Sequence, residues 1–184
     1  DIDDAAEAAI AWHEGALESI VVPSGSVARG ELVLVHPGSE VDDEDGFWTI
    51  QRLTSHNQYS DEGGFMGHCV GGHGYWGRHQ NDELDICSVR NEQGDPTLTI
   101  EILKDHDGEP RKIEQIKGSN NETPMTMIMS QGTQSGDDWE MVLDGAVALI
   151  NHIESEHGVT LRRGSDANEL LLYEDTGGEG IAKG

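Results

Sequence analysis

The sequence predicts an α+β fold, in which a small antiparallel β-meander packs against a long C-terminal helix. Three segments of high β propensity, residues 84–90, 97–103 and 111–117, follow one another with short connections. Both connections contain glycine and proline, as β-hairpin turns often do. Further along, residues 137–156 place apolar side chains at a three-and-four spacing, which is typical of an amphipathic helix. Strands followed by a helix of this kind are typical of the α+β class.

The middle segment of the predicted meander alternates between apolar and mostly polar residues. Leu98, Ile100 and Ile102 therefore share one face of the sheet, and the residues between them share the other. We expect the three apolar side chains to pack against the helix of residues 137–156. A helix anywhere within residues 84–117 would contradict the meander.

Before the meander, the sequence predicts an N-terminal helix over residues 3–20, since apolar residues recur there at helical spacing. Residues 31–36 and 47–53 are predicted strands. The polar residues 54–64 allow either a short helix or an irregular connection, and the sequence does not decide between these two.

The length of 184 residues fits one domain with a usable core, so we expect residues 1–174 to form a single α+β domain. Residues 170–173 are predicted to add a final edge strand. The glycine-rich residues 175–184 are predicted to be a flexible tail.

The chain is strongly acidic, with 36 acidic and 11 basic residues and a formal net charge of -25. This charge disfavours nonspecific nucleic-acid binding, because a phosphate backbone is repelled by an acidic surface. Scarce lysine with abundant Asp and Glu favours a halophilic or marine source. No apolar run is long enough to span a bilayer, so no membrane partner is expected.

Cys69 and Cys87 are the only two cysteines. Two thiols in a chain of this length do not form the dense disulfide framework of small secreted domains. We therefore expect a reducing compartment, in which Cys69 and Cys87 do not pair with each other.

Several short blocks within residues 47–121 carry a resemblance to a known family. They are Glu62-Gly63, Met66-Gly67-His68-Cys69-Val70-Gly71, Tyr75, Ser88-Val89-Arg90, Gly94 with Pro96, Thr99-Ile100-Glu101, and Gln115-Ile116-Lys117-Gly118 with Asn120. In these blocks the chain resembles the PcfJ-like family of conjugative plasmids and phages. The resemblance implies a mobile-element or viral context and no established reaction. The chain departs from the family pattern at His73, where a tyrosine is expected directly after the glycines.

The glycine-rich loop that contains His68 and Cys69 is the first candidate site. Glycines let a backbone adopt positive φ and approach a partner closely. A cysteine with a histidine base, either His73 or a distant one, and with Glu101 or Asn120 as orienting group would follow the logic of cysteine nucleophiles. The alternative is a small buried cysteine that packs as a hydrophobic residue.

Polar residues on the neighbouring strands give a second hypothesis. If Arg90 and Glu101 lie on one sheet face, they could hold a phosphate, a nucleotide or a carboxylate. A cross-strand ion pair without function is the alternative. We expect the two sets to converge beside a groove, and the candidate catalytic residues are His68, Cys69, Arg90 and Glu101. The candidate ligand-binding residues are Ser88, Thr99, Gln115 and Asn120.

A zinc site is the competing hypothesis for the same loop. Cys69, His73, His79 and Cys87 would supply two thiolates and two imidazoles, enough for tetrahedral zinc. Their spacing matches no standard zinc pattern, so no metal ligand is assigned and the cofactor is left open.

Two functions from different classes follow from these observations. The first is an accessory protein of a phage or conjugative element, with a polar His/Cys/Arg/Glu site whose reaction the sequence does not identify. The second is a non-enzymatic structural protein of a virion or assembly, in which the same residues only stabilise the loop. Both hypotheses imply protein partners and a location in the host cytoplasm or the virion.

Overall fold

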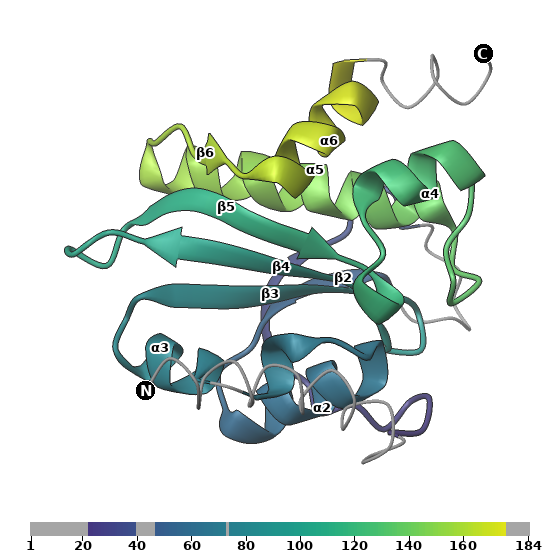
Figure 1. The fold of residues 1–184 in the computed structure, drawn as a ribbon, viewed down its shortest axis with the longest axis horizontal. Helices are drawn as coiled ribbons and strands as arrows, with labels where there is room; N and C mark the ends of the chain where they lie inside the picture. Colours follow the sequence, from purple (N-terminus) through teal and green to yellow (C-terminus); the bar gives the residue numbers. More distant parts are fainter. Residues whose placement is uncertain (1–21, 40–46, 73, 176–184) are drawn as a thin grey trace, which may run out of the picture.

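A computed structural model of the chain describes residues 22–39, 47–72 and 74–175. In this part, a six-stranded sheet carries helices on both faces, which confirms the α+β class (Figure 1). The predicted helix over residues 3–20 and residues 176–184 of the predicted tail lie outside the described residues.

The regular elements follow the chain in a simple order. They are β1 (Glu31–Val35), β2 (Thr49–Arg52), α2 (His56–Met66), the 3-10 turn η1 (Cys69–Gly71), α3 (Tyr75–Gln80), β3 (Leu84–Arg90), β4 (Pro96–Lys104), β5 (Pro110–Lys117), the 3-10 turn η2 (Ser119–Asn121), α4 (Pro124–Ser130), α5 (Trp139–His157), β6 (Arg162–Arg163) and α6 (Ser165–Asp175).

The strands lie side by side in the order of the sequence, from β1 to β6. Neighbours from β1 to β5 are antiparallel, whereas β6 pairs with β5 in parallel. The predicted meander is confirmed as β3, β4 and β5. Gly94 and Gly108 lie in its two hairpin turns with φ of 82° and 79°, a conformation that favours glycine.

One face of the sheet packs against α4, α5 and α6 (Figure 1). Leu98, Ile100 and Ile102 are buried in this core together with Val142 and Ile150 of α5, as the alternation along β4 predicts. The assignment of the two faces is therefore confirmed.

Helix α5 matches the helix predicted over residues 137–156. Its N-terminus is capped by the Asp138 carboxylate, which accepts hydrogen bonds from the backbone N–H groups of Glu140 and Met141. Gly158 ends it in the left-handed conformation, with φ of 63°. None of the described helices, α5 included, is long and apolar enough to cross a membrane.

The other face of the sheet is covered by α2, η1 and α3 (Figure 1). A second, smaller apolar core lies here, formed by Leu53, Tyr59, Val70, Leu84 and Ile86. The choice left open for residues 54–64 is settled in favour of the helix α2, whose N-cap is Ser55. The polar residues of β4 that alternate with its apolar residues are thus enclosed instead of facing water.

The edge strand predicted over residues 170–173 is wrong, because these residues belong to α6. Leu170 and Tyr173 are buried and lie three residues apart, whereas Leu171 and Leu172 are exposed, which is a helical pattern. A run of four apolar residues is too short for its periodicity to separate a strand from a helix.

Candidate functional site

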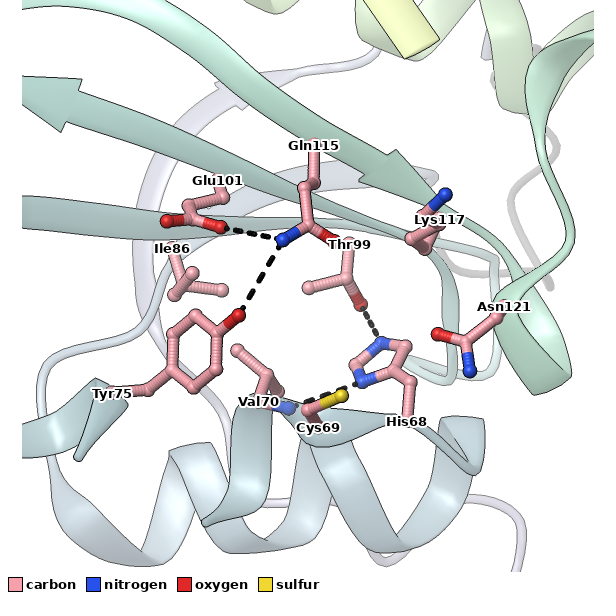
Figure 2. Close-up of a pocket in the computed structure, with 10 residues that line it drawn as sticks. All are labelled: His68, Cys69, Val70, Tyr75, Ile86, Thr99, Glu101, Gln115, Lys117 and Asn121. Carbon is pink, nitrogen blue, oxygen red and sulfur yellow. Dashed lines mark hydrogen bonds between the residues drawn. The ribbon is translucent and has the colours of Figure 1, made fainter. Parts of the chain in front are cut away.

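A small pocket lies between the sheet and the segment that joins α2 to α3 (Figure 2). Its volume is about 30 Å³, room for roughly two water molecules. The side chains come from η1, α3, β3, β4, β5 and the η2 turn. They belong to His68, Cys69, Val70, Tyr75, Ile86, Thr99, Glu101, Gln115, Lys117 and Asn121.

His68 forms a buried wall of this pocket, and both nitrogens of its ring are engaged (Figure 2). Nδ1 accepts the backbone N–H of Val70 at 3.5 Å, and Nε2 lies 2.8 Å from Oγ1 of Thr99. Because Nδ1 is an acceptor, Nε2 carries the proton and donates to Thr99. Burial lowers the pKa of His68 to about 4, so the ring is neutral at pH 7.

Behind His68, a buried network continues to Arg90. Thr99 donates to Glu62 Oε2 at 2.6 Å, and the Arg90 guanidinium donates to Glu62 Oε1 at 3.0 Å. Arg90 also donates to Ser88 Oγ at 3.1 Å and to the carbonyl oxygen of Ala28 at 3.0 Å. Burial raises the pKa of Glu62, and the guanidinium of Arg90 opposes this shift. The pocket wall is therefore fixed by side chains from α2, β3 and β4.

The structure brings together three of the four candidate catalytic residues, His68, Cys69 and Glu101. Arg90 is not among them, because it is fully buried and pairs with Glu62 instead of Glu101. Both residues do lie on one sheet face, but Glu101 is opposite Ile86, whereas Arg90 is opposite Pro96 at the far end of β3. The expected Arg90–Glu101 pair is thus corrected to Arg90–Glu62.

Two of the four candidate ligand-binding residues, Thr99 and Gln115, line the pocket. Ser88 lies deeper, in the network with Arg90. Asn120 does not line the pocket, since its side-chain amide donates to Gln134. Its neighbour Asn121 lines the pocket in its place.

The two cysteines lie on opposite faces of the sheet and are not joined by a disulfide, as expected. Cys69 lines the pocket, whereas Cys87 is buried in the core beneath α5. Burial raises the pKa of the Cys69 thiol, and the nearby Glu101 carboxylate raises it further. The candidate base His73 lies outside the described residues, and His68, the neighbour of Cys69 in the sequence, has both ring nitrogens hydrogen-bonded.

The zinc hypothesis is not supported by the positions of its ligands. Cys69 and Cys87 are separated by the sheet, and His79 stacks on Trp76 with a centroid distance of 5.0 Å. Within residues 22–39, 47–72 and 74–175, no three His, Cys, Asp or Glu side chains are close enough to hold a metal ion.

Glu101 is the carboxylate of the pocket, and its side chain is only 6% exposed. Gln115 donates to it at 3.3 Å, and the guanidinium of Arg78 lies 3.7 Å away. Burial raises the pKa of Glu101. Tyr75 and Arg78 are three residues apart on α3, so this helix directs both side chains to the same side. Burial raises the pKa of Tyr75 to about 12, so its hydroxyl stays protonated at pH 7.

The pocket lies within a segment that matches a known family. The model of the PcfJ-like protein family matches residues 38–131, which are 94 of the 184 residues. The chain belongs to the PcfJ-like family. All the residues that line the pocket fall inside the matched segment. No curated protein and no solved structure matches this PcfJ-like chain.

Sequence reasoning missed Glu62, which holds the network of this PcfJ-like protein together. Its only signal in the sequence is its place in the block Glu62-Gly63, one of those that carry the family resemblance. Nothing in the sequence joins it to Thr99 or Arg90, which are 37 and 28 residues away. Tyr75 is one of the residues that carry the family resemblance, but nothing in the sequence indicates that it lines the pocket.

His68 is expected to make the PcfJ-like protein more stable at pH 7 than at pH 4. Its pKa is about 4 in the folded protein, below the ordinary value of 6.5, so the unfolded chain takes up this proton first as the pH falls. The stabilisation is complete above pH 6.5 and is lost as the pH falls through 4. Urea unfolding between pH 4 and 7 should give the wild type a steeper decline than His68→Gln, by up to about 1.4 kcal/mol per pH unit.

His106→Gln, a change at an exposed turn residue, controls for the loss of a histidine as such. Parallel stability curves for the wild type and His68→Gln would contradict the buried, neutral state of His68.

Proposed function

We propose that this PcfJ-like protein is an accessory protein of a phage or conjugative element, and that its pocket binds a small polar ligand without covalent chemistry. The absence of covalent chemistry is inferred from His68, whose two ring nitrogens both form hydrogen bonds. With Nδ1 and Nε2 both hydrogen-bonded, His68 cannot take a proton from Cys69. The raised pKa of Cys69 also disfavours the thiolate that a nucleophile requires.

The lining of the pocket supports a binding role. Small-ligand sites combine apolar walls with a few polar groups that fix the orientation of the ligand. Val70 and Ile86 supply the apolar walls here, and Tyr75, Glu101 and Gln115 supply polar groups that face the same space (Figure 2). The buried network behind His68 keeps one wall rigid, which lowers the entropic cost of binding.

A fragment screen by NMR on the full chain tests the binding role. Ligands of the pocket are expected to shift the side-chain amide signal of Gln115, and Glu101→Gln is expected to reduce their affinity. Glu92→Gln removes the same charge from an exposed turn and should leave binding unchanged. Cys69→Ser should retain binding. A covalent adduct on Cys69 in the mass spectrum would instead support a thiol reaction.

One observation favours the alternative, a structural protein of a virion or assembly. Strand β1 lies at the outer edge of the sheet in the described part of the chain, and its side chains Leu32 and Val35 are 56% and 46% exposed. An exposed apolar edge strand is a surface on which another chain can pair. Counting copies in purified particles separates the two functions, because a structural protein is present in many copies and an accessory protein is scarce.

A further inference from the structure

We infer that the pocket selects a primary ammonium group, and that Glu101 is the residue that binds it. This inference rests on the proposed function and narrows its ligand to one chemical class. Four observations carry it: the incomplete pairing of Glu101, the acceptors around it, the size of the pocket, and the position of Arg78.

Glu101 is a buried carboxylate whose two partners among the described residues, Gln115 and Arg78, both lie at long distance. Its hydrogen bond from Gln115 is 3.3 Å long, and the Arg78 guanidinium at 3.7 Å is beyond hydrogen-bonding distance. Glu62, which is fully buried, accepts hydrogen bonds at 2.6 and 3.0 Å. Buried charged carboxylates normally have such short, charge-assisted bonds. The Glu101 carboxylate can therefore accept further hydrogen bonds from a group in the pocket.

The surroundings of Glu101 favour a cation over an anion. The Tyr75 hydroxyl beside it is a further acceptor, and the edge of the pocket on β5 is closed by Lys117. The ammonium of Lys117 is already neutralised by Asp166, at 3.1 and 3.2 Å from its two oxygens. The Glu101 carboxylate would repel an anion, and the cation that lines the pocket, Lys117, is already paired with Asp166. The net charge of -25 also attracts cations towards the protein.

The size of the pocket separates an ammonium from larger cations. The space of about 30 Å³ admits a compact head group and excludes a nucleobase. An ammonium is a compact charge with three donors, whereas a guanidinium is a wider planar fork. A primary ammonium therefore fits the volume, and the Glu101 carboxylate and the Tyr75 hydroxyl can accept hydrogen bonds from it.

Arg78 acts as a displaceable counter-ion in this arrangement. Its side chain is 43% exposed and reaches Glu101 from α3 without a hydrogen bond. Because the Arg78 side of this ion pair is open to solvent and the pair has no hydrogen bond, the pair contributes little to stability. A bound ammonium would take its place beside Glu101, so Arg78 competes with the ligand.

NMR titration of the full-length chain tests the inference, with n-propylammonium chloride as probe and the Gln115 side-chain amide as readout. n-Propanol and sodium propionate, at the same ionic strength, are the matched neutral and anionic probes. Only the ammonium is expected to give a saturable shift. Glu101→Gln should weaken binding about tenfold or more, because the buried charge pair is lost. Arg78→Ala should tighten it about two- to threefold, because an exposed competitor is removed.

A short peptide with one lysine and blocked ends identifies the source of the ammonium. Affinity for the peptide about tenfold above that for n-propylammonium indicates a lysine of a protein partner, because further contacts then contribute. The reverse order indicates a free amine, and either order supports the inference. Glu92→Gln again controls for the loss of one negative charge.

Three results would overturn the inference, and they differ in whether the proposed binding function survives. If n-propanol or propionate shifts the Gln115 amide as strongly as the ammonium, the pocket binds ligands but does not select a cation. If Glu101→Gln and the wild type bind the ammonium equally, Glu101 is not its partner. If neither these probes nor any fragment shifts the amide, the proposed binding function fails as well.

Discussion

Replacing Arg90 with Ala is expected to lower the free energy of unfolding by about 3–5 kcal/mol, as breaking a buried ion pair does. The Arg90 side chain is fully buried, and its guanidinium donates to Glu62 at 3.0 Å. Without it, the carboxylate of Glu62 stays buried with no cation beside it. Urea denaturation at pH 7 measures the effect.

Two further variants test whether the loss of stability comes from the Arg90–Glu62 ion pair. Arg111→Ala removes an exposed guanidinium from β5 and should cost less than about 1 kcal/mol. In the double variant Arg90→Met with Glu62→Gln, no buried charge is left, and the new amide can still accept from Thr99. Replacing a buried ion pair by uncharged residues is often close to neutral, so the double variant should recover much of the lost stability. A single variant Arg90→Ala as stable as Arg111→Ala would contradict the buried pair.

The meander and the helix α5 could be predicted because local and long-range preferences agree there. In residues 84–117, alternation and turn glycines point to the same register, and Gly94 and Gly108 adopt the positive φ that hairpin turns require. In α5, the apolar stripe, the Asp138 cap and the terminal Gly158 define the same helix. The strand predicted over residues 170–173 failed because four apolar residues fit either period.

The candidate site could be predicted only in part, because some of its contacts depend on how distant segments pack together. Glycines around His68 and Cys69 mark a loop that approaches other backbone, and the alternation along β4 places Thr99 and Glu101 on one face. The partner of Arg90 depends on how far α2 reaches across that face, which no local pattern contains. Since Arg90 and Glu101 share a sheet face, the alternation alone is also compatible with a charge pair between them, and only the tertiary position of Glu62 excludes it.

The position of His68 depends on the close packing of η1 against α2, where Gly63 of α2 contacts Gly71 of η1. A Cβ on Gly63 would lie 2.5 Å from the backbone nitrogen of Gly71 and 2.8 Å from its Cα. Both atoms belong to the backbone, so no rotation of a side chain can relieve the contact. The pair of glycines thus sets the distance at which the loop with His68 and Cys69 packs onto α2.

Gly63→Ala is therefore expected to lower the free energy of unfolding by about 3 kcal/mol, at the upper end of the range for overpacking. Because η1 must move away from α2, the NMR signals of His68 and Thr99 should shift as well. Gly77→Ala is the matched control, since a Cβ at Gly77 in α3 meets no atom within 4 Å. It should leave stability unchanged or raise it by up to about 1 kcal/mol, because alanine favours the helix. Equal stability of the two variants would mean that α2 and η1 do not pack backbone against backbone, and the position of His68 would then need another cause.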